Sequence, residues 1–265
     1  MKVSDIRIYP IKSIAGILLN QAQVEPQGLA NDRLMMLVDD NGFFITQRKY
    51  PQLALIKTQL REQSLSLCVP MFPELLISKD DFSSQLLKVV IWKDECSGYV
   101  ANNNINEWFS KYLGFSVRLI NYSIERPRKT DPNYSIDSDI VSFADGFPLL
   151  AIAQSSLSDL NTRLTDPVTM TYFRPNVVVE GCEAYAEDLW KRIKIGKVEF
   201  EAVKRCSRCV LTTINPNTGI KHPAGEPLKT LSNYRKNTAG VLFGMNLIAR
   251  SSGDIAIGDK VEIMV

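Results

Sequence analysis

Two cysteines three residues apart are the most chemically informative feature of the sequence. Cys206 and Cys209 stand in the run EAVKRCSRCVLTTINPNTG, with Arg205 and Arg208 beside them. Neighbouring guanidinium groups favour a thiolate, the form of cysteine that binds metals. A C-x-x-C pair has three chemical interpretations: half of a zinc site, a redox disulfide, or a soft-metal ligand beside a bystander thiol.

The rest of the sequence weakens the first two interpretations. A zinc site requires a second pair of ligands, but Cys68, Cys96 and Cys182 stand alone and His222 is the single histidine. A thioredoxin-like disulfide is expected at the start of a helix in a βαβ unit, whereas β-branched residues and a turn follow this pair. Soft-metal ligation stays open, and so does the structural alternative of two small thiols buried at the end of a strand.

Composition indicates a folded cytoplasmic chain that binds neither nucleic-acid polymers nor membranes. The 265 residues are 45% hydrophobic and carry 31 basic and 29 acidic side chains. Because both charges are spread along the chain, no domain-wide basic field is expected. No apolar run approaches the roughly 18 residues that span a bilayer, and the first residues do not resemble a signal peptide. The five cysteines are odd in number and sparse, so we expect reduced thiols.

The elements that must position the cysteines begin with a β-rich first third. Segments of alternating polarity, separated by turn residues, predict short strands that form a small β-barrel or sandwich. A helix is expected over 104–114, since its apolar residues share one face and Gly114 ends the pattern. The predicted strands are 3–11, 18–26, 33–40, 43–47, 64–70 and 86–92, with a hairpin-like turn at 39–42.

A second β-rich block is expected after a loop. Residues 122–139 are polar and contain two prolines, which indicates an exposed loop or linker. Residues 155–164 space leucines for one helical face, with Ser155 or Ser156 as the N-cap. The strands predicted after this helix are 176–181, 192–203 and 255–265.

Several other residues have simple structural interpretations. His222 is expected in a loop, and Trp92, Trp108 and Trp190 are expected in the core rather than at a cofactor. No glycine-rich phosphate motif indicates a nucleotide site. An arginine is usually a solvated surface charge. Arg174 is a candidate exception, because it lies between Phe173 and Pro175 ahead of a predicted buried strand, where an unpaired charge is costly.

A set of motifs in a consistent order resembles one protein family. RCSRCVLTT with NPNTG, YFRPNVVVEGCEAYAEDLW and GEPLKTLSNYR are similar to the MOSC domain, named from the C-terminal part of molybdenum cofactor sulfurase. YPIKSIAG, GLANDRLMMLVD and ITQRKYPQLALI resemble its companion N-terminal β-barrel domain. The chain looks closest to the amidoxime-reducing branch, which includes mitochondrial amidoxime-reducing components and bacterial proteins that detoxify N-hydroxylated bases. The resemblance covers nearly the whole chain.

The resemblance implies that the chain binds the molybdenum cofactor, Mo-molybdopterin, with Cys209 as the catalytic protein ligand to the metal and Cys206 as a bystander. A thiolate suits a soft centre that already carries dithiolene sulfur. The phosphate of the cofactor requires positive charge and hydrogen-bond donors. By motif match, the cofactor-binding residues are Lys12, Ser13, Arg33, Arg174, Asn176, Ser207 and Arg208, followed by Asp145, Gly146 and Asn246.

The implied function is a molybdenum-dependent oxidoreductase that reduces N-hydroxylated small molecules such as hydroxylaminopurines, hydroxylamines and amidoximes. Some bacterial relatives continue into a ferredoxin domain, whereas this sequence ends at Val265. A separate flavin or iron–sulfur protein is therefore the expected electron donor. Two alternatives stay open: a carrier that binds the cofactor without turnover, and a sulfur carrier with a persulfide on Cys209.

The expected fold is mainly β with peripheral helices, in the α+β class. We expect an N-terminal β-barrel domain over 1–90 and a MOSC β-barrel domain over 91–265, the latter including a connecting helical and loop segment. The cofactor site is expected between the two domains, since binding at domain interfaces is common.

Overall fold

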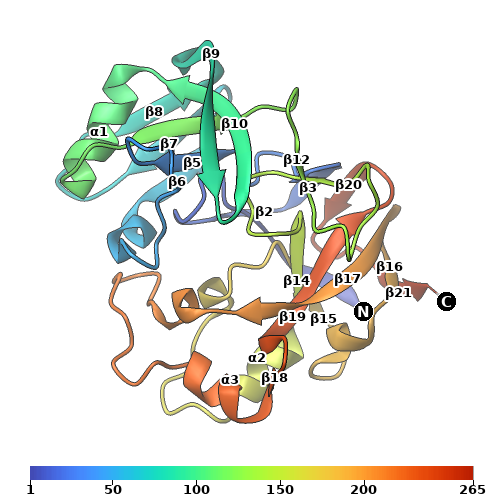
Figure 1. Cartoon of the computed structure of the whole chain (residues 1–265). Helices are drawn as coiled ribbons and strands as arrows, with labels where there is room; N and C mark the ends of the chain where they lie inside the picture. The colour runs from blue at the N-terminus through green and yellow to red at the C-terminus, as the bar shows by residue number, and fades with distance from the viewer. Residues whose placement is uncertain (265) are drawn as a thin grey trace.

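A large mixed sheet forms the lower half of the molecule (Figure 1). The computed structural model describes residues 1–264. The order in the sheet is β2-β1-β15-β14-β19-β17-β16-β21, with β18 paired to β19. These strands are β1 (Lys2–Ile8), β2 (Ile17–Leu19), β14 (Leu149–Ala153), β15 (Val177–Glu180), β16 (Arg192–Ile195), β17 (Val198–Arg208), β18 (Lys236–Asn237), β19 (Gly240–Ala249) and β21 (Val261–Met264).

The upper half contains two smaller sheets and the longest helix (Figure 1). Helix α1 (Asn103–Leu113) starts at Asn102, whose side chain accepts the Ile105 N–H, and ends at Gly114 in the left-handed conformation. Its apolar face packs on the core of this half, as the sequence predicts. The sheets are β5-β11-β10-β9 and β6-β7-β8, formed by β5 (Met35–Val38), β6 (Lys57–Leu60), β7 (Ser64–Cys68), β8 (Leu75–Ser78), β9 (Phe82–Ile91), β10 (Asp94–Ala101) and β11 (Arg118–Tyr122).

Short elements complete the fold. Strands β3 (Gln21–Glu25) and β4 (Gly28–Leu29) form a sheet with β20 (Gly253–Ala256), and β12 (Arg128–Lys129) pairs with β13 (Ile140–Val141). The remaining helices are α2 (Gln154–Asn161), α3 (Leu228–Tyr234) and the 3₁₀ turns η1 (Pro51–Leu55), η2 (Lys79–Asp81), η3 (Met170–Tyr172), η4 (Ala186–Leu189) and η5 (Val210–Thr213).

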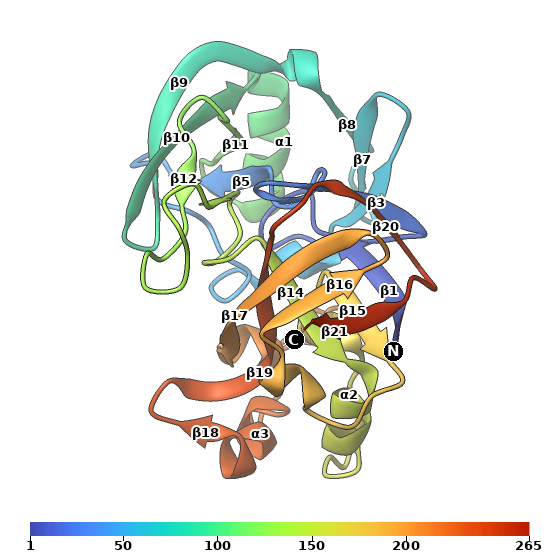
Figure 2. The same cartoon turned by 90° about the vertical axis from the view of Figure 1, so that its right-hand side faces the viewer.

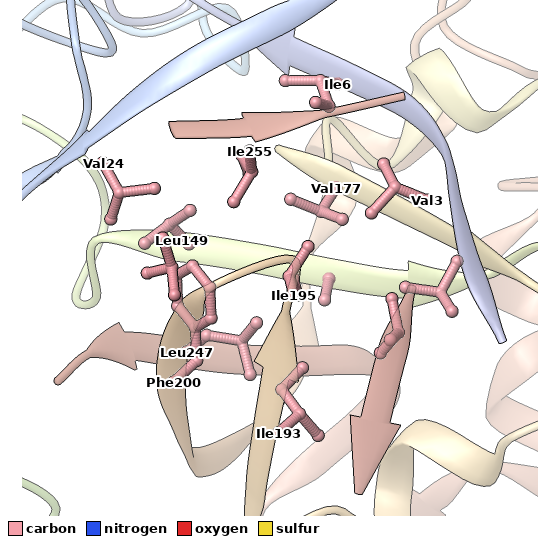
Figure 3. Packing of buried hydrophobic residues seen from close by; sticks show 14 of the residues in the cluster. Val3, Ile6, Val24, Leu149, Val177, Ile193, Ile195, Phe200, Leu247 and Ile255 are labelled. Carbon is pink, nitrogen blue, oxygen red and sulfur yellow. The ribbon is translucent and has the colours of Figure 1, made fainter. Parts of the chain in front are cut away.

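The largest core lies on the inner face of the long sheet, under the small sheet of β3 and β20 (Figure 3). Aliphatic side chains from both ends of the chain meet here, among them Val3, Ile6 and Ile255. Phe200 and Leu247 add the contributions of β17 and β19. Burial of this apolar surface holds β17 in place, the strand that leads to Cys206 and Cys209.

The mainly β prediction is confirmed, but several expected elements differ. Strands β9 and β10 form one hairpin across residue 90, and β1 and β3 pair with β15 and β20 of the second half (Figure 2). We therefore propose that the first domain ends after β11 and that the first 29 residues pack with the second domain. The expected division at residue 90 stays a prediction beside this proposal.

Several local predictions are wrong. The single strand expected over 192–203 is a hairpin of β16 and β17. No strand covers 43–47, where only isolated bridges at Phe43 and Phe44 occur. Helix α2 begins one residue before Ser155 and its N-cap is Ala153, because both serines lie inside the helix. The expected strand over 255–265 splits at a turn, with β20 and β21 in different sheets. Among residues 1–264, no helix is long and apolar enough to span a membrane.

Candidate functional site

All eleven site residues predicted from the sequence line one cavity of about 120 Å³. They come from six separate segments of the chain, which the large sheet and the loops of the upper half bring together. The contributing segments are the turn after β1, the short loop before β5, the loop before β14, the segment before β15, the end of β17 and the middle of β19. The cavity therefore lies where the two halves of the chain meet.

Cys209 follows the last residue of β17 and is exposed. The pairing of β17 with β19 shifts register twice, between Ala202 and Lys204 and between Arg205 and Ser207. Such bulges turn a strand and often lie beside functional sites. Both Cys206 and Cys209 line the cavity. Both thiols are free, with no disulfide between them.

Cys206 is half-buried and contacts a neighbouring arginine. Nη1 of Arg208 donates to Sγ of Cys206 at 3.1 Å, and Nη2 donates to the carbonyl of Phe173 at 2.6 Å. Nε of Arg208 is buried without a partner among residues 1–264. The two contacts hold the guanidinium at the cavity wall beside Cys209.

The cavity is strongly cationic. Five basic side chains line it against one carboxylate, that of Asp145. Several like charges at close range raise the local potential and favour an anionic ligand. The basic residues are Lys12, Arg33, Arg48, Arg174 and Arg208.

Lys12 and Asp145 form the ion pair at one side of the cavity. Nζ of Lys12 donates to Oδ1 of Asp145 at 2.5 Å and to the carbonyl of Phe143 at 2.9 Å. Burial lowers the pKa of Lys12 to about 8, although Asp145 opposes this shift. Burial acts to raise the pKa of Asp145, but the charge and hydrogen bond of Lys12 outweigh it and hold that pKa well below its usual value. Asp145 is therefore ionised at neutral pH.

Arg33 and Arg174 both lie over the ring of Tyr9. Their guanidinium carbons are 4.4 and 4.1 Å from the ring centroid. Tyr9 is buried, and Gly16 makes its position possible, since a Cβ there would lie 2.4 Å from the ring atom Cε1. The aromatic ring thus supports two of the five cations.

Arg33 is neutralised and Arg174 is not. Nη1 of Arg33 donates to the buried carboxylate of Asp32 at 2.7 Å and to Oδ1 of Asn176 at 2.9 Å. The guanidinium of Arg174 has no hydrogen-bond or ion-pair partner within residues 1–264. Burial lowers the pKa of Arg174 to about 10. An unpaired cation in this position is costly unless a ligand neutralises it.

Backbone strain gathers at the same place. Ser13, Arg33 and Arg174 have φ angles of 71, 49 and 55°. The left-handed region is uncommon for residues other than glycine, and such strain often collects at binding sites. Each of the three residues lines the cavity.

Three of the uncharged predicted residues differ in burial and in hydrogen bonding. Asn176 is buried, and its amide bonds Arg33, the Leu150 N–H and the carbonyl of Arg7, which makes it a positioning residue. Nδ2 of Asn246 donates to the carbonyl of Lys204, which leaves its oxygen for a ligand. Ser207 is exposed.

Sequence reasoning missed three residues that shape the site. Arg48 lines the cavity and is 3.8 Å from Asp145. Trp92, expected in the core, is 43% exposed and donates to Asp145 at 3.3 Å. Arg128, in the expected linker, is buried and donates to the carbonyls of Ala144 and Asp145 at 2.6 and 2.8 Å. Arg48 lies in the quoted motif ITQRKYPQLALI, which was the only signal for any of them.

The residues present fit a ligand that combines a soft metal with an anionic tail. An exposed thiol offers one soft donor, and unpaired guanidinium nitrogens of Arg174 and Arg208 offer charge-assisted hydrogen bonds to phosphate oxygens. His222 lies in a loop away from the cavity lining, as expected, with Nδ1 accepting from its own turn.

Comparison with known proteins finds a matching family for each half of the chain. Residues 1–116 match the MOSC N-terminal beta barrel domain, and residues 138–262 match the MOSC domain. Mitochondrial amidoxime reducing component 2 of Rattus norvegicus is 37% identical over 99% of this chain and 83% of its own length. Mitochondrial amidoxime-reducing component 1 of Homo sapiens is 32% identical over 99% and 82%. The YUAD protein of Bacillus subtilis, covering 98% of this chain and 93% of its own, has a TM-score of only 0.44 at 11% identity.

Proposed function

The chain belongs to the family of MOSC-domain proteins that carry the MOSC N-terminal β-barrel domain and include the amidoxime-reducing components, and from this premise we propose that it is a molybdenum-dependent reductase of N-hydroxylated compounds. Hydroxylaminopurines, hydroxylamines and amidoximes are the proposed substrates. A separate flavin or iron–sulfur protein delivers the electrons. A cytoplasmic location stays a prediction from the sequence.

The observation that carries the proposal is an exposed thiol in a cavity with unneutralised cations. Cys209 would hold the metal of Mo-molybdopterin through its thiolate, and the cofactor supplies two-electron redox chemistry when bound. Arg174, Arg208 and Lys12 would bind the phosphate, each through a charge-assisted hydrogen bond. The remaining predicted cofactor-binding residues are Ser13, Arg33, Asp145, Gly146, Asn176, Ser207 and Asn246.

The side chains divide the binding task. Asn176 fixes Arg33 in the wall, and the Tyr9 ring supports Arg33 and Arg174. Cys206 and the Phe173 carbonyl orient Arg208. Because these groups are already held in position, little conformational entropy is lost when an anion binds. In the reaction the N–O bond of the substrate breaks, two electrons and two protons are consumed, and the amine and water leave.

Replacing the two cysteines separately tests the proposal. Protein made in a molybdenum-competent host should contain close to one molybdenum per chain, and Cys209→Ala should lose nearly all of it. Cys206→Ala should keep most of its metal, because a single thiolate completes the coordination. Reduced viologen, an artificial electron donor, should drive reduction of 6-hydroxylaminopurine by the wild type and by Cys206→Ala, but not by Cys209→Ala.

Three results would contradict the reductase proposal. Equal metal loss in both variants indicates a dithiol or zinc site. Metal-loaded protein that oxidises no viologen with any N-hydroxylated substrate, while a rat or human relative does, indicates a cofactor carrier. Protein free of molybdenum with a persulfide on Cys209, measured by mass spectrometry, indicates a sulfur carrier.

A further inference from the structure

Trp92 lies at the tip of the β9–β10 hairpin, which extends from the upper half of the molecule toward the lower (Figure 1). Its side chain is 43% exposed, while the other two tryptophans, Trp108 and Trp190, are buried. An indole on a hairpin turn exposes a large apolar face to water, which the fold itself does not require.

The backbone at this position is unfavourable for tryptophan. Ile91 and Asp94 are paired, so Trp92 and Lys93 form a two-residue turn, and Trp92 has a φ of 59°. Turns of this kind favour asparagine, aspartate and glycine because those residues adopt positive φ at little cost. A bulky residue kept in a strained turn indicates a task for its side chain.

Trp92 contacts residues that line the cavity. The guanidinium of Arg48 lies 4.1 Å from its ring centroid, and Nε1 donates to Oδ1 of Asp145 at 3.3 Å. Both Arg48 and Asp145 line the cavity that contains Cys209. Phe44, at 5.0 Å between ring centroids, packs against the indole in a tilted arrangement. The indole is thus fixed beside the cavity.

A second aromatic group contributes from the loop that contains Asp145. Phe147 lines the same cavity and packs edge-on against Tyr134, with 6.1 Å between ring centroids. The ammonium of Lys204 lies 4.1 Å from the ring of Tyr134 and 6.0 Å from that of Phe147. Aromatic side chains backed by cations therefore flank the cavity from both halves of the chain.

We propose that Trp92, held by Arg48 and assisted by Phe147, is the surface on which a flat aromatic N-hydroxylated substrate stacks, and that it sets a preference for such substrates over small aliphatic hydroxylamines. The inference rests on the proposed reductase function. An aromatic face gains stacking and dispersion energy from a planar heterocycle but very little from an N-alkyl hydroxylamine. The specificity is the difference between the binding free energies of the two kinds of substrate.

The test compares two substrates in three proteins. Viologen-driven reduction of 6-hydroxylaminopurine and of N-methylhydroxylamine is measured with cofactor-loaded wild type, Trp92→Leu and Trp92→Phe. Loss of one stacked base costs about tenfold in affinity, so Trp92→Leu should raise the ratio of KM for the purine to KM for N-methylhydroxylamine by about that factor. Trp92→Phe removes the hydrogen bond to Asp145 but keeps an aromatic face, and should retain most of the preference.

A matched control removes a different exposed ring. Phe43 is 52% exposed on the neighbouring turn and has no aromatic or cation–π contact within the described residues 1–264. Phe43→Ala should leave both KM values unchanged. Equal losses for both substrates in Trp92→Leu, or a Trp92→Phe variant as impaired as Trp92→Leu, would show that the indole only anchors the Asp145 loop, and would overturn the inference.

A binding measurement separates this inference from the reductase proposal. Adenine, the reduced form of 6-hydroxylaminopurine, should bind cofactor-loaded wild type by calorimetry about tenfold more tightly than it binds Trp92→Leu, by the same stacking contribution. If neither substrate is reduced but adenine binding depends on Trp92, the reductase proposal fails and the stacking surface stands. If both are reduced and adenine binds the two proteins equally, the stacking surface fails alone.

Discussion

Burial and an ion pair act in opposite directions on the charge of Lys12. It is buried, which disfavours its charge, yet it forms the ion pair with Asp145 and contributes to the cationic wall of the cavity. The outcome is a pKa of about 8, well below the ordinary 10.5. Its charge is therefore present at neutral pH and is lost at moderately alkaline pH.

This shift predicts opposite pH effects on binding and on stability. As pH rises through about 8, Lys12 loses its charge, so retention of the phosphate-bearing cofactor should fall. Between about 8 and 10.5 the unfolded chain binds more protons at Lys12 than the folded one, so its contribution to the free energy of unfolding should rise with pH. Molybdenum content after gel filtration measures cofactor retention. Urea unfolding of cofactor-free protein measures the free energy of unfolding.

Lys12→Met is the reference, since it lacks the titrating group. The difference in molybdenum content between wild type and Lys12→Met should change around pH 8, and the difference in free energy of unfolding should change between about 8 and 10.5. Parallel curves for the two proteins would show that Lys12 neither titrates in this range nor contacts the anion.

At the scale of residues, the order of the motifs along the chain predicted more of the cavity-lining residues than the residue types alone did. The eleven expected residues line one cavity. Each of them was predicted from a motif whose position in the chain is specific. Trp92 and Arg128 lie outside those motifs, and a tryptophan or arginine by itself indicates equally a core or surface position. The polar bonds of Asn176 depend on packing between distant segments, which no local pattern contains.

At the scale of elements, the approach of β17 and β19 determines where the thiols lie. Ser207 pairs with Leu242, next to the start of β19 at Gly240. A Cβ added to Gly240 would lie 2.2 Å from Oγ of Ser207, and the φ of Gly240 is 114°. Glycine at this position therefore lets the end of β17 lie close to its neighbour.

Gly240→Ala should reduce cofactor retention and lower the free energy of unfolding by about 1–3 kcal/mol, the cost of holding a residue other than glycine at a φ of 114°. Gly258→Ala is the matched control, because Gly258 has a φ of 90° and nothing within 4 Å of an added Cβ. It should show the cost of backbone strain without the effect on molybdenum content. Equal molybdenum content in the two variants would mean that the position of Ser207 does not affect the site.

Element types were more predictable than element boundaries. The α1 pattern carries both its apolar face and its Gly114 end within the sequence, and both are confirmed. Ser155 and Ser156 fit an N-cap by type, but Oγ of Ser156 instead contacts the buried carboxylate of Glu187 at 2.8 Å. That bond joins residues 31 positions apart and overrides the local preference.

At the scale of the whole molecule, Arg128 ties the two halves together beside the cavity. Its side chain is 5% exposed and its Nε donates to Oδ2 of Asp94, at the start of β10, at 2.7 Å. The other nitrogens donate to the carbonyls of the loop that carries Asp145. One guanidinium therefore sets the distance between the β9–β10 hairpin and that loop.

Arg128→Ala should lower the free energy of unfolding by about 1–3 kcal/mol, because it leaves the carbonyls of Ala144 and Asp145 without their donor, whereas the half-exposed carboxylate of Asp94 is solvated by water. Arg128→Lys should recover less than half, since an ammonium lacks the planar fork. Arg126→Ala, an exposed arginine two residues away, should change stability by at most about 0.5 kcal/mol. Guanidinium chloride unfolding measures all three, and a cost for Arg128→Ala as small as the control would contradict the linking role.

The pairing of the first strands with the last has a consequence for how the chain is made. Lys2 pairs with Glu180, Ala22 pairs with Ile255, and the Val261 N–H donates to the carbonyl of Met1 at 2.9 Å. A ribosome releases β1 and β3 long before β15 and β20, their partners in the second half of the chain. Pairings of such high contact order are slow to form. Until those partners emerge, β1 and β3 have only their neighbours β2 and β4 to pair with, and the cavity forms only when the sheet is completed.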